Sequence, residues 1–250
     1  MPQKLKNKKI GLLCTVDGPI LSFFIEALLN NGYDNICLIA DLKGFSNDDL
    51  IRFKERTNNT FHSRKLTLGD FIEYKIPVYF VNSHNAEGCI NHIASENFNL
   101  LINAGTPRKL SSKFLSECGC DVLNVHPGVL PDYRGATCVE WAILNDDPIG
   151  NSSHFMTEEY DAGPIIKVEK YKFKHGCSYS DIRSEIYKNS IRLMLKSVSL
   201  IFENNLNTKN MDPQTKEIKP YLPISKKDMN KVLKKIKNNL HPSICLPKVK

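Results

Sequence analysis

Residues 124–135 read NVHPGVLPDYRG, and the fold of the whole chain can be worked out from this stretch. It follows a short apolar run over residues 120–125 that is typical of a buried strand. Asn124 and His126 are two positions apart, so an extended chain projects both side chains to the same side. Two prolines and a glycine then interrupt regular structure. A polar pair at a strand end indicates either a ligand site of an open α/β sheet or a turn with a hydrogen-bonded histidine.

Apolar runs alternate with helical patterns on both sides of this stretch. We expect strands at 9–14, 36–40, 77–81, 100–103, 121–125, 152–156 and 165–173, and helices at 21–30, 48–56, 68–74, 86–96, 112–117, 139–145 and 180–203. An exposed loop is expected to follow Arg56. Strands that alternate with helices predict an α/β fold with a Rossmann-like, mainly parallel sheet.

The end of the chain differs from the rest in composition. We expect a catalytic domain over residues 1–203, a polar linker over 204–224, and a short basic helical extension with a tail over 225–250. Ser225 and Asp228 have the spacing of a capping box at the start of that helix. Its apolar face must be buried, either against the main domain or against a partner in a homodimer.

The net charge of +7 comes from this extension. Residues 205–250 hold 11 lysines and three acidic residues, whereas residues 1–204 carry a net charge of −1. The main domain therefore lacks the basic character of a nucleic-acid binder, and we expect no nucleic-acid partner. No apolar run reaches the about 20 residues that span a bilayer, and no signal peptide precedes the first strand. We expect a cytoplasmic protein without stable membrane insertion.

The cysteines and most histidines show no spacing that indicates a catalytic or metal-binding role. Among eight cysteines only Cys118 and Cys120 are close together, without the paired spacing of a zinc site, so we expect reduced thiols and no metal. His154 is expected to be a buried, hydrogen-bonded histidine near the polar pair Asn124 and His126. The remaining histidines are expected to be ordinary surface or loop residues: His62, His84, His92, His175 and His241.

The pattern Asn-x-His-Pro-x-x-Leu-Pro-x-Tyr-Arg-Gly of residues 124–135 closely resembles the signature of folate-dependent formyltransferases. Residues 154–165, HFMTEEYDAGPI, resemble the second motif of that family, which ends in Asp-x-Gly-Pro. Residues 104–110 lie where relatives bind the pterin ring. The resemblance extends from about residue 8 to about residue 203, although Gly128 stands where the family usually has serine.

The resemblance implies transfer of a formyl group from N10 of 10-formyltetrahydrofolate to an amine. Asn124 would donate a hydrogen bond to the developing oxyanion, and His126 would move the proton. Asp161 would orient His126 or stabilise its charge. The residues implied in binding the folate are Thr106, Pro107, Arg108, Leu110, Met156 and Tyr160.

Differences between this sequence and individual subfamilies reduce the number of possible acceptor amines. Residues 14–20, CTVDGPI, lack the glycine- and serine-rich phosphate loop of glycinamide ribonucleotide transformylases, and Asp17 would repel a phosphate. We expect neither the C-terminal barrel of methionyl-tRNA formyltransferases nor the N-terminal regulatory domain of formyltetrahydrofolate hydrolases. The chain then resembles the compact sugar N-formyltransferases, which act on nucleotide-linked amino sugars. Trp141 would either line a sugar or base pocket or pack in the core.

Three alternatives stay open. The acceptor could be phosphoribosylglycinamide, or another small amine such as a hydroxylated ornithine. A catalytically inactive binder of folate or of a nucleotide sugar is the alternative from a different class. Turnover of the formyl donor distinguishes an enzyme from such a binder.

Overall fold

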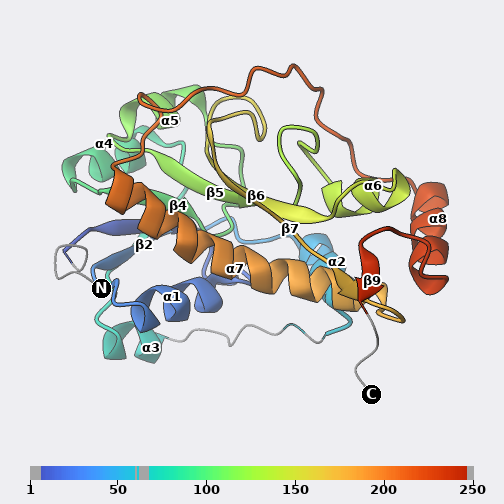
Figure 1. The fold of residues 1–250 in the computed structure, drawn as a ribbon. Helices are drawn as coiled ribbons and strands as arrows, with labels where there is room; N and C mark the ends of the chain where they lie inside the picture. The colour runs from blue at the N-terminus through green and yellow to red at the C-terminus, as the bar shows by residue number, and fades with distance from the viewer. Residues whose placement is uncertain (1–6, 60, 62–67, 247–250) are drawn as a thin grey trace.

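A seven-stranded sheet forms the centre of the molecule in the computed structural model, which describes residues 7–59, 61 and 68–246 (Figure 1). The strands are β1 (Ile10–Cys14), β2 (Ile36–Asp41), β3 (Val78–Val81), β4 (Leu100–Asn103), β5 (Val122–His126), β6 (Gly150–Phe155) and β7 (Ile165–Lys170). Their order is β3-β2-β1-β4-β5-β6-β7. Strands β1 to β5 are parallel, and β6 and β7 continue the sheet antiparallel. The predicted mainly parallel, Rossmann-like α/β fold is confirmed.

Eight helices surround this sheet within the described residues. They are α1 (Leu21–Asn30), α2 (Asn47–Thr57), α3 (Leu68–Glu73), α4 (Glu87–Ser95), α5 (Ser112–Glu117), α6 (Cys138–Leu144), α7 (Tyr179–Asn204) and α8 (Lys226–Lys237). All of them were predicted; the ends of α1 to α7 differ from the predicted ends by at most one residue, and α8 lies within the extension predicted over 225–250. His62 and most of the loop predicted after Arg56 lie outside the described residues.

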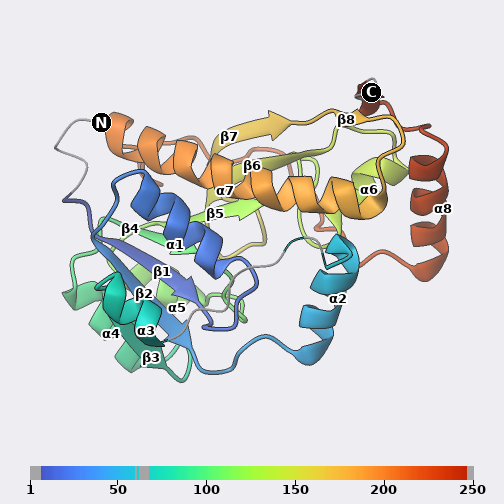
Figure 2. The same cartoon turned by 90° about the horizontal axis from the view of Figure 1, so that it is seen from below.

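Side chains along the central strands point alternately to the two faces of the sheet, so the apolar core has two layers. Leu12 of β1 packs with α1 and α7 on one face, whereas its neighbour Leu13 packs with α4 and α5 on the other. Successive strand side chains point to opposite faces, so a strand that is apolar throughout is covered on both sides. Figure 2 shows α1 and α7 side by side across the first face.

The helix α8 is packed within the chain rather than left unpartnered. Its Val232 and Ile236 are buried with Val139 and Ile143 of α6. Ser225 caps the helix by accepting a hydrogen bond from Asp228 N at 3.1 Å. The division of the chain at residues 203/204 and 224/225 stays a prediction.

The predicted strand over 165–173 is interrupted. Strand β7 ends at Lys170, and a separate short strand β8 (Phe173–Lys174) pairs in parallel with β9 (Ile244–Leu246). Phe173 N donates to Ser243 O at 2.7 Å, so the chain leaves the main sheet to meet the C-terminal segment. The sequence of β9 is too short to have been predicted from periodicity.

None of the helices in the described part of the chain combines the length and the apolar character needed to cross a membrane.

Two apolar residues of α8 that differ in exposure can be compared to test whether this helix packs on α6. Ile236 is 2% exposed and Leu233 is 41% exposed on the same helix. We expect Ile236→Ala to lower the free energy of unfolding by about 2–4 kcal/mol, because it empties a packed contact with α6. Leu233→Ala should change it by less than about 0.5 kcal/mol. Urea unfolding measures both, and equal effects would contradict docking of α8 on α6.

Candidate active site

Polar side chains gather at the carboxyl edge of the sheet, where open α/β sheets bind ligands. Asn103 ends β4, and Asn124 and His126 lie two residues apart in β5. The loop between β6 and β7 brings Asp161 to the same place. The structure therefore collects the predicted trio of Asn124, His126 and Asp161 at one point.

The carboxylate of Asp161 lies between two imidazoles and accepts a hydrogen bond from a backbone amide. Its Oδ2 lies 3.3 Å from His126 Nδ1 and accepts a hydrogen bond from Gly135 N at 2.8 Å. Its Oδ1 lies 3.4 Å from His154 Nε2. His154 is buried, as predicted, but it also touches the carboxylate directly and is therefore part of the site.

A tight turn presents this carboxylate. Asp161 has a φ of 53°, in the left-handed region that few side chains occupy. A Cβ atom on Gly163 would lie 1.9 Å from Phe155 O, so only glycine allows the loop to cross β6 here. The Asp-x-Gly-Pro motif thus has a steric reason for its glycine.

Burial and charge act in opposite directions on the pair. Burial alone would raise the pKa of Asp161, but attraction from His126 and His154 and the hydrogen bond from the Gly135 amide hold that pKa at about 2. Burial lowers the pKa of His126 below its ordinary value, and the negative charge of Asp161 opposes this only in part. At neutral pH the site therefore holds a carboxylate beside a neutral imidazole, which can accept a proton.

His126 occupies the space that a side chain at position 128 would need. A Cβ on Gly128 would lie 2.6 Å from His126 Nε2 and 2.6 Å from Tyr133 O. The same Nε2 is 2.8 Å from Tyr133 O, to which it can donate. Because residue 128 is a glycine, the His126 imidazole can turn into the signature loop. His126 is 5% exposed in this position.

The amide of Asn124 is oriented from both sides. Its Oδ1 accepts from Asn103 Nδ2 at 3.0 Å, and its Nδ2 lies 3.1 Å from His154 Nε2. His154 Nδ1 lies 2.8 Å from Phe155 O and carries a proton there, so Nε2 can accept from Asn124. A second hydrogen on Asn124 Nδ2 is left to donate elsewhere.

A cavity of about 320 Å³ opens beside Asn124 and Asp161. All six residues predicted to bind the folate line it: Thr106, Pro107, Arg108, Leu110, Met156 and Tyr160. Leu110 and Met156 are apolar residues of this lining, and Asn103 adds a polar group. At the mouth, Lys109 Nζ lies 4.8 Å from the centre of the Tyr160 ring.

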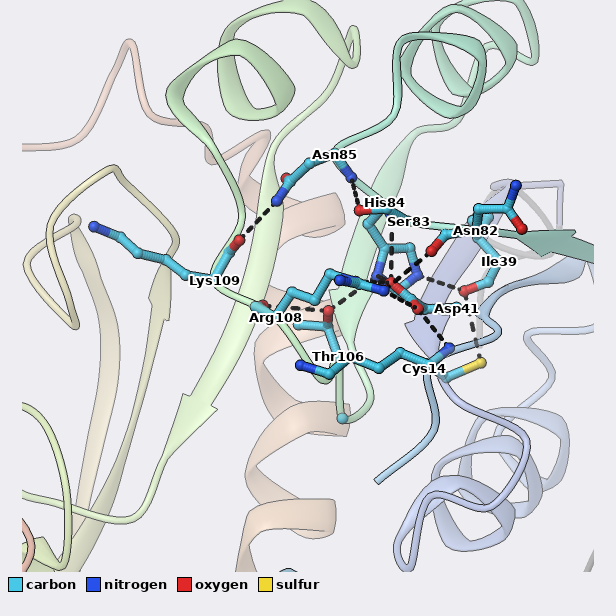
Figure 3. Close-up of polar contacts among 12 residues, drawn as sticks. Cys14, Ile39, Asp41, Asn82, Ser83, His84, Asn85, Thr106, Arg108 and Lys109 are labelled. Carbon is cyan, nitrogen blue, oxygen red and sulfur yellow. Dashed lines mark hydrogen bonds and ion pairs between the residues drawn. The ribbon is translucent and has the colours of Figure 1, made fainter. Parts of the chain in front are cut away.

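An ion pair between the partly exposed Arg108 and the buried Asp41 supports the wall of this cavity (Figure 3). Arg108 donates from Nε to Asp41 Oδ2 at 2.7 Å and from Nη2 to Asp41 Oδ1 at 3.2 Å. Arg108 Nη2 also donates to Asn82 O at 3.1 Å. The Arg108 guanidinium and the Lys43 amide keep the pKa of Asp41 below its ordinary value, although burial acts to raise it. Most of the Arg108 hydrogen-bonding capacity is thus used inside the protein.

His84 completes this support. Its Nε2 lies 2.8 Å from Ile39 O and its Nδ1 lies 2.9 Å from Thr106 Oγ1. Burial lowers the pKa of His84, which favours a neutral ring that donates to Ile39 and accepts from Thr106. Both Thr106 and Arg108 are therefore fixed from behind by residues of other strands.

Two expectations about histidines were wrong. His84 has no exposed surface and His241 is 2% exposed, so neither is an ordinary surface or loop residue. His84 lies at the carboxyl end of β3 among buried polar partners, and His241 Nδ1 accepts from Ser243 N at 3.0 Å beside β9. Their spacing along the chain gave no sign of this, because their partners are distant in sequence or backbone atoms.

A second cavity of about 400 Å³ is bordered by Ala136 and Thr137, which directly follow the signature loop. Its lining comes from several segments: Phe45, Asp49, Arg52, Phe53 and Arg56 of α2 and the loop before it, Tyr187 of α7, Pro223 between α7 and α8, Pro19 and Ile20 before α1, and Gly105, Ala136 and Thr137 beside the site. Gly105 lines this cavity and the next residue, Thr106, lines the first, so consecutive residues of one loop border both cavities. Trp141 instead packs on Tyr221 and donates to Leu222 O at 2.9 Å.

No group of three or more His, Cys, Asp or Glu side chains arranged to hold a metal ion occurs among the residues that the structure describes.

Comparison with known proteins agrees with this geometry. The sequence model of a family described as formyl transferase matches residues 8–198, which is more than half of the chain. The chain belongs to the formyl transferase family. The resemblance predicted from the two motifs is thereby confirmed.

Individual relatives are more distant. Formyltetrahydrofolate deformylase 2, mitochondrial, of Arabidopsis thaliana is 29% identical over 157 residues, which cover 62% of this chain and 42% of that protein. The chain thus spans less than half the length of this relative.

Solved structures share the fold. Phosphoribosylglycinamide formyltransferase of Anaplasma phagocytophilum matches with a TM-score of 0.59 and 21% identity, over 87% of this chain and 98% of that one. A sugar N-formyltransferase of a Shewanella species matches with a TM-score of 0.56 and 18% identity, over 86% and 77%. At these identities the likeness shows the fold alone.

The Asp41 ion pair can be tested by stability. We expect Asp41→Asn to lower Tm by about 3 °C or more, because a buried amide cannot replace two charge-assisted hydrogen bonds from Arg108. The exposed Asp34→Asn, which removes the same charge, serves as the control and should leave Tm within about 1 °C. Differential scanning calorimetry compares them, and equal Tm values would remove the support assigned to Asp41.

Proposed function

We propose that this protein transfers a formyl group from N10 of 10-formyltetrahydrofolate to the amine of a nucleotide-linked amino sugar. The observation that carries the proposal is the Asp161 carboxylate between His126 and His154, with Asn124 at the end of a cavity of about 320 Å³. Family membership supports the reaction type and the formyl donor. The acceptor is proposed from the second cavity.

Asn124, His126 and Asp161 have distinct roles in the proposed reaction. Asn124 Nδ2 donates to the formyl oxygen as negative charge develops on it when the amine attacks the formyl carbon. His126, neutral at working pH with its proton on Nε2 toward Tyr133 O, takes a proton on Nδ1 from the attacking nitrogen and returns it to the departing N10. Asp161 stabilises the imidazolium between these two events, and its own low pKa keeps it ionised throughout.

The donor fits the first cavity in shape and chemistry. Leu110 and Met156 face a flat ring from its lining, and Tyr160 lies at the entrance. Thr106 and Arg108 are held by His84 and Asp41, so this wall is preorganised.

The second cavity favours an anionic acceptor that carries a ring. Phe45, Phe53 and Tyr187 offer faces for a nucleobase or a sugar. Arg52 and Arg56 offer charge for a diphosphate and outnumber the single carboxylate of the lining, Asp49, which lies 3.9 Å from Arg52 Nη1. The centroids of the Phe53 and Tyr187 rings are 4.8 Å apart, so they form one aromatic wall. Gly105 lines this cavity and Thr106 lines the first, so an acceptor bound here would lie next to the donor cavity.

The reaction is tested with purified protein, 10-formyltetrahydrofolate and a panel of amines. The panel contains dTDP- and GDP-linked 4-amino sugars, glycinamide ribonucleotide, hydroxyornithine and water alone, with products identified by mass spectrometry. We expect a single formyl group on a nucleotide sugar. His126→Ala and Asp161→Ala should fold and lose about 10²–10⁴-fold in kcat, because each removes a group needed for proton transfer.

The pH profile checks the assigned roles. His126 must be neutral to accept a proton, so kcat/KM should fall as the pH drops through its pKa, which burial holds below about 6.5. Asp161→Asn removes an attraction that raises this pKa, so the acidic limb should move to lower pH. A limb that moves to higher pH, or one that persists in His126→Ala, would exclude His126 as the base. Release of formate without an acceptor would indicate a hydrolase, and binding without turnover would indicate an inactive binder.

The acceptor cavity is tested on α2. Arg52→Ala should raise KM for the nucleotide sugar about 10-fold with little change in kcat, because a charge-assisted contact is worth about 1.4 kcal/mol or more. Lys54→Ala removes the same charge from the same helix without facing the cavity. An equal effect of both changes would show that only the overall charge matters.

A further inference from the structure

The segment between α7 and α8, residues 205–224, runs across the two loops that form the site. Figure 1 shows it leaving α7, passing over the loops that follow β5 and β6, and descending to α8. It lies beyond residue 198, where the match to the family ends. We refer to it as the strap.

Gln214 of the strap uses its whole side-chain amide to join the loops. Its Nε2 donates to Asp161 O at 2.9 Å and to Gly163 O at 2.6 Å. Its Oε1 accepts from Arg134 Nη2 at 2.8 Å and from Arg134 Nε at 3.2 Å. Both amide hydrogens and both acceptor positions of Gln214 are therefore occupied.

These bonds close a ring through the catalytic carboxylate. Asp161 Oδ2 accepts from Gly135 N, and Gly135 follows Arg134 in the chain. Arg134 Nη2 donates to Gln214 Oε1, and Gln214 Nε2 donates to Asp161 O, which closes the ring. Arg134 is 4% exposed, and its Nη2 also donates to Lys216 O at 3.1 Å. The ring thus fixes both ends of the Asp161 residue, its backbone carbonyl and its side chain.

The backbone of Asp161 needs such support. A non-glycine residue in the left-handed region is held there by its surroundings, and Asp161 has a φ of 53°. Hydrogen bonds from Gln214 to the carbonyls of Asp161 and Gly163 hold the two ends of this turn.

A second attachment keeps the strap in register with the signature loop. Tyr221 N donates to Arg134 O at 2.8 Å, and Ala136 N donates to Tyr221 O at 2.9 Å. The Tyr221 ring stacks on Tyr133, with centroids 5.3 Å apart and planes 8° from parallel. A Cβ on Gly135 would lie 2.6 Å from Tyr221 O, so the glycine of the signature makes room for the strap.

We propose that Gln214 is a positioning residue of the active site, and that the strap holds the Asp161 carboxylate at its distance from His126. The inference rests on the proposed function of Asp161 and His126. It assigns a role in the formyl transfer to a segment beyond the region matched by the family. Gln214 acts through the Asp161 turn and does not touch the reacting atoms.

The test is Gln214→Glu in the full chain. A glutamate keeps an acceptor for Arg134 but places an oxygen against the carbonyls of Asp161 and Gly163, so it breaks only the link to the turn. We expect kcat to fall about 10- to 100-fold, because small displacements of reacting groups have effects of this size. KM for the nucleotide sugar should change less than 3-fold, since the acceptor cavity is separate from Gln214. Exposed Thr215→Ala, the next position of the strap, should leave kcat unchanged.

A second readout is independent of catalysis. Hydrogen–deuterium exchange of the peptide over residues 132–137 reports on the Gly135 amide, which Asp161 protects. In Gln214→Glu this peptide should exchange faster, while in Thr215→Ala it should not. Gln214→Ala, which also frees Arg134, should have a lower Tm than Gln214→Glu.

The two readouts keep the outcomes distinct. If Gln214→Glu matches Thr215→Ala in kcat and in exchange, the proposal is overturned and the strap is only packing. A wild-type protein inactive on every acceptor would overturn the proposed function instead, and the exchange measurement would still show whether Gln214 holds the turn.

Discussion

The ionised carboxylate of Asp161 is the interaction on which the rest of the site depends. A buried charge is tolerated only when several partners compensate for its lost hydration. Here the partners are two imidazoles and the Gly135 amide, while Gln214 holds the backbone carbonyl of the same residue. Each comes from a different part of the chain. The carboxylate therefore collects the end of β5, strand β6, the signature loop and the strap around one point.

The walls of the site repeat this arrangement on the donor side. Asp41 at the end of β2 holds Arg108 after β4, and His84 after β3 holds Thr106. In both places a buried polar residue fixes a residue that lines a cavity. Rigid walls reduce the ordering that a ligand must impose when it binds. The parallel arrangement of β1 to β5 makes this possible, because it brings successive strand ends to one edge.

The sequence predicted the parts of this structure that are encoded locally. The helices and main strands follow from periodicity, and the two motifs place Asn124, His126 and Asp161 at the same edge. The sequence could not predict the Asp41–His84–Arg108 cluster, because residues 41, 84 and 108 share no spacing and become neighbours only through the strand order β3-β2-β1-β4. Gln214 was missed for a similar reason, since a polar segment with few apolar residues has the composition of a linker. Burial of His126 beside Gly128 is likewise a matter of three-dimensional packing.

The hydrogen bonds of the Arg134 guanidinium go to Gln214 and Lys216, which follow it by 80 and 82 residues. A ribosome makes the signature loop well before it makes these acceptors. While the chain is growing, the sheet can assemble up to β7 and α7, but the guanidinium still has to face water. The loop becomes buried only when the strap arrives. Completion of the site is thus tied to the late part of synthesis, so a chain cut short after α7 would carry the signature residues without the closed network around them.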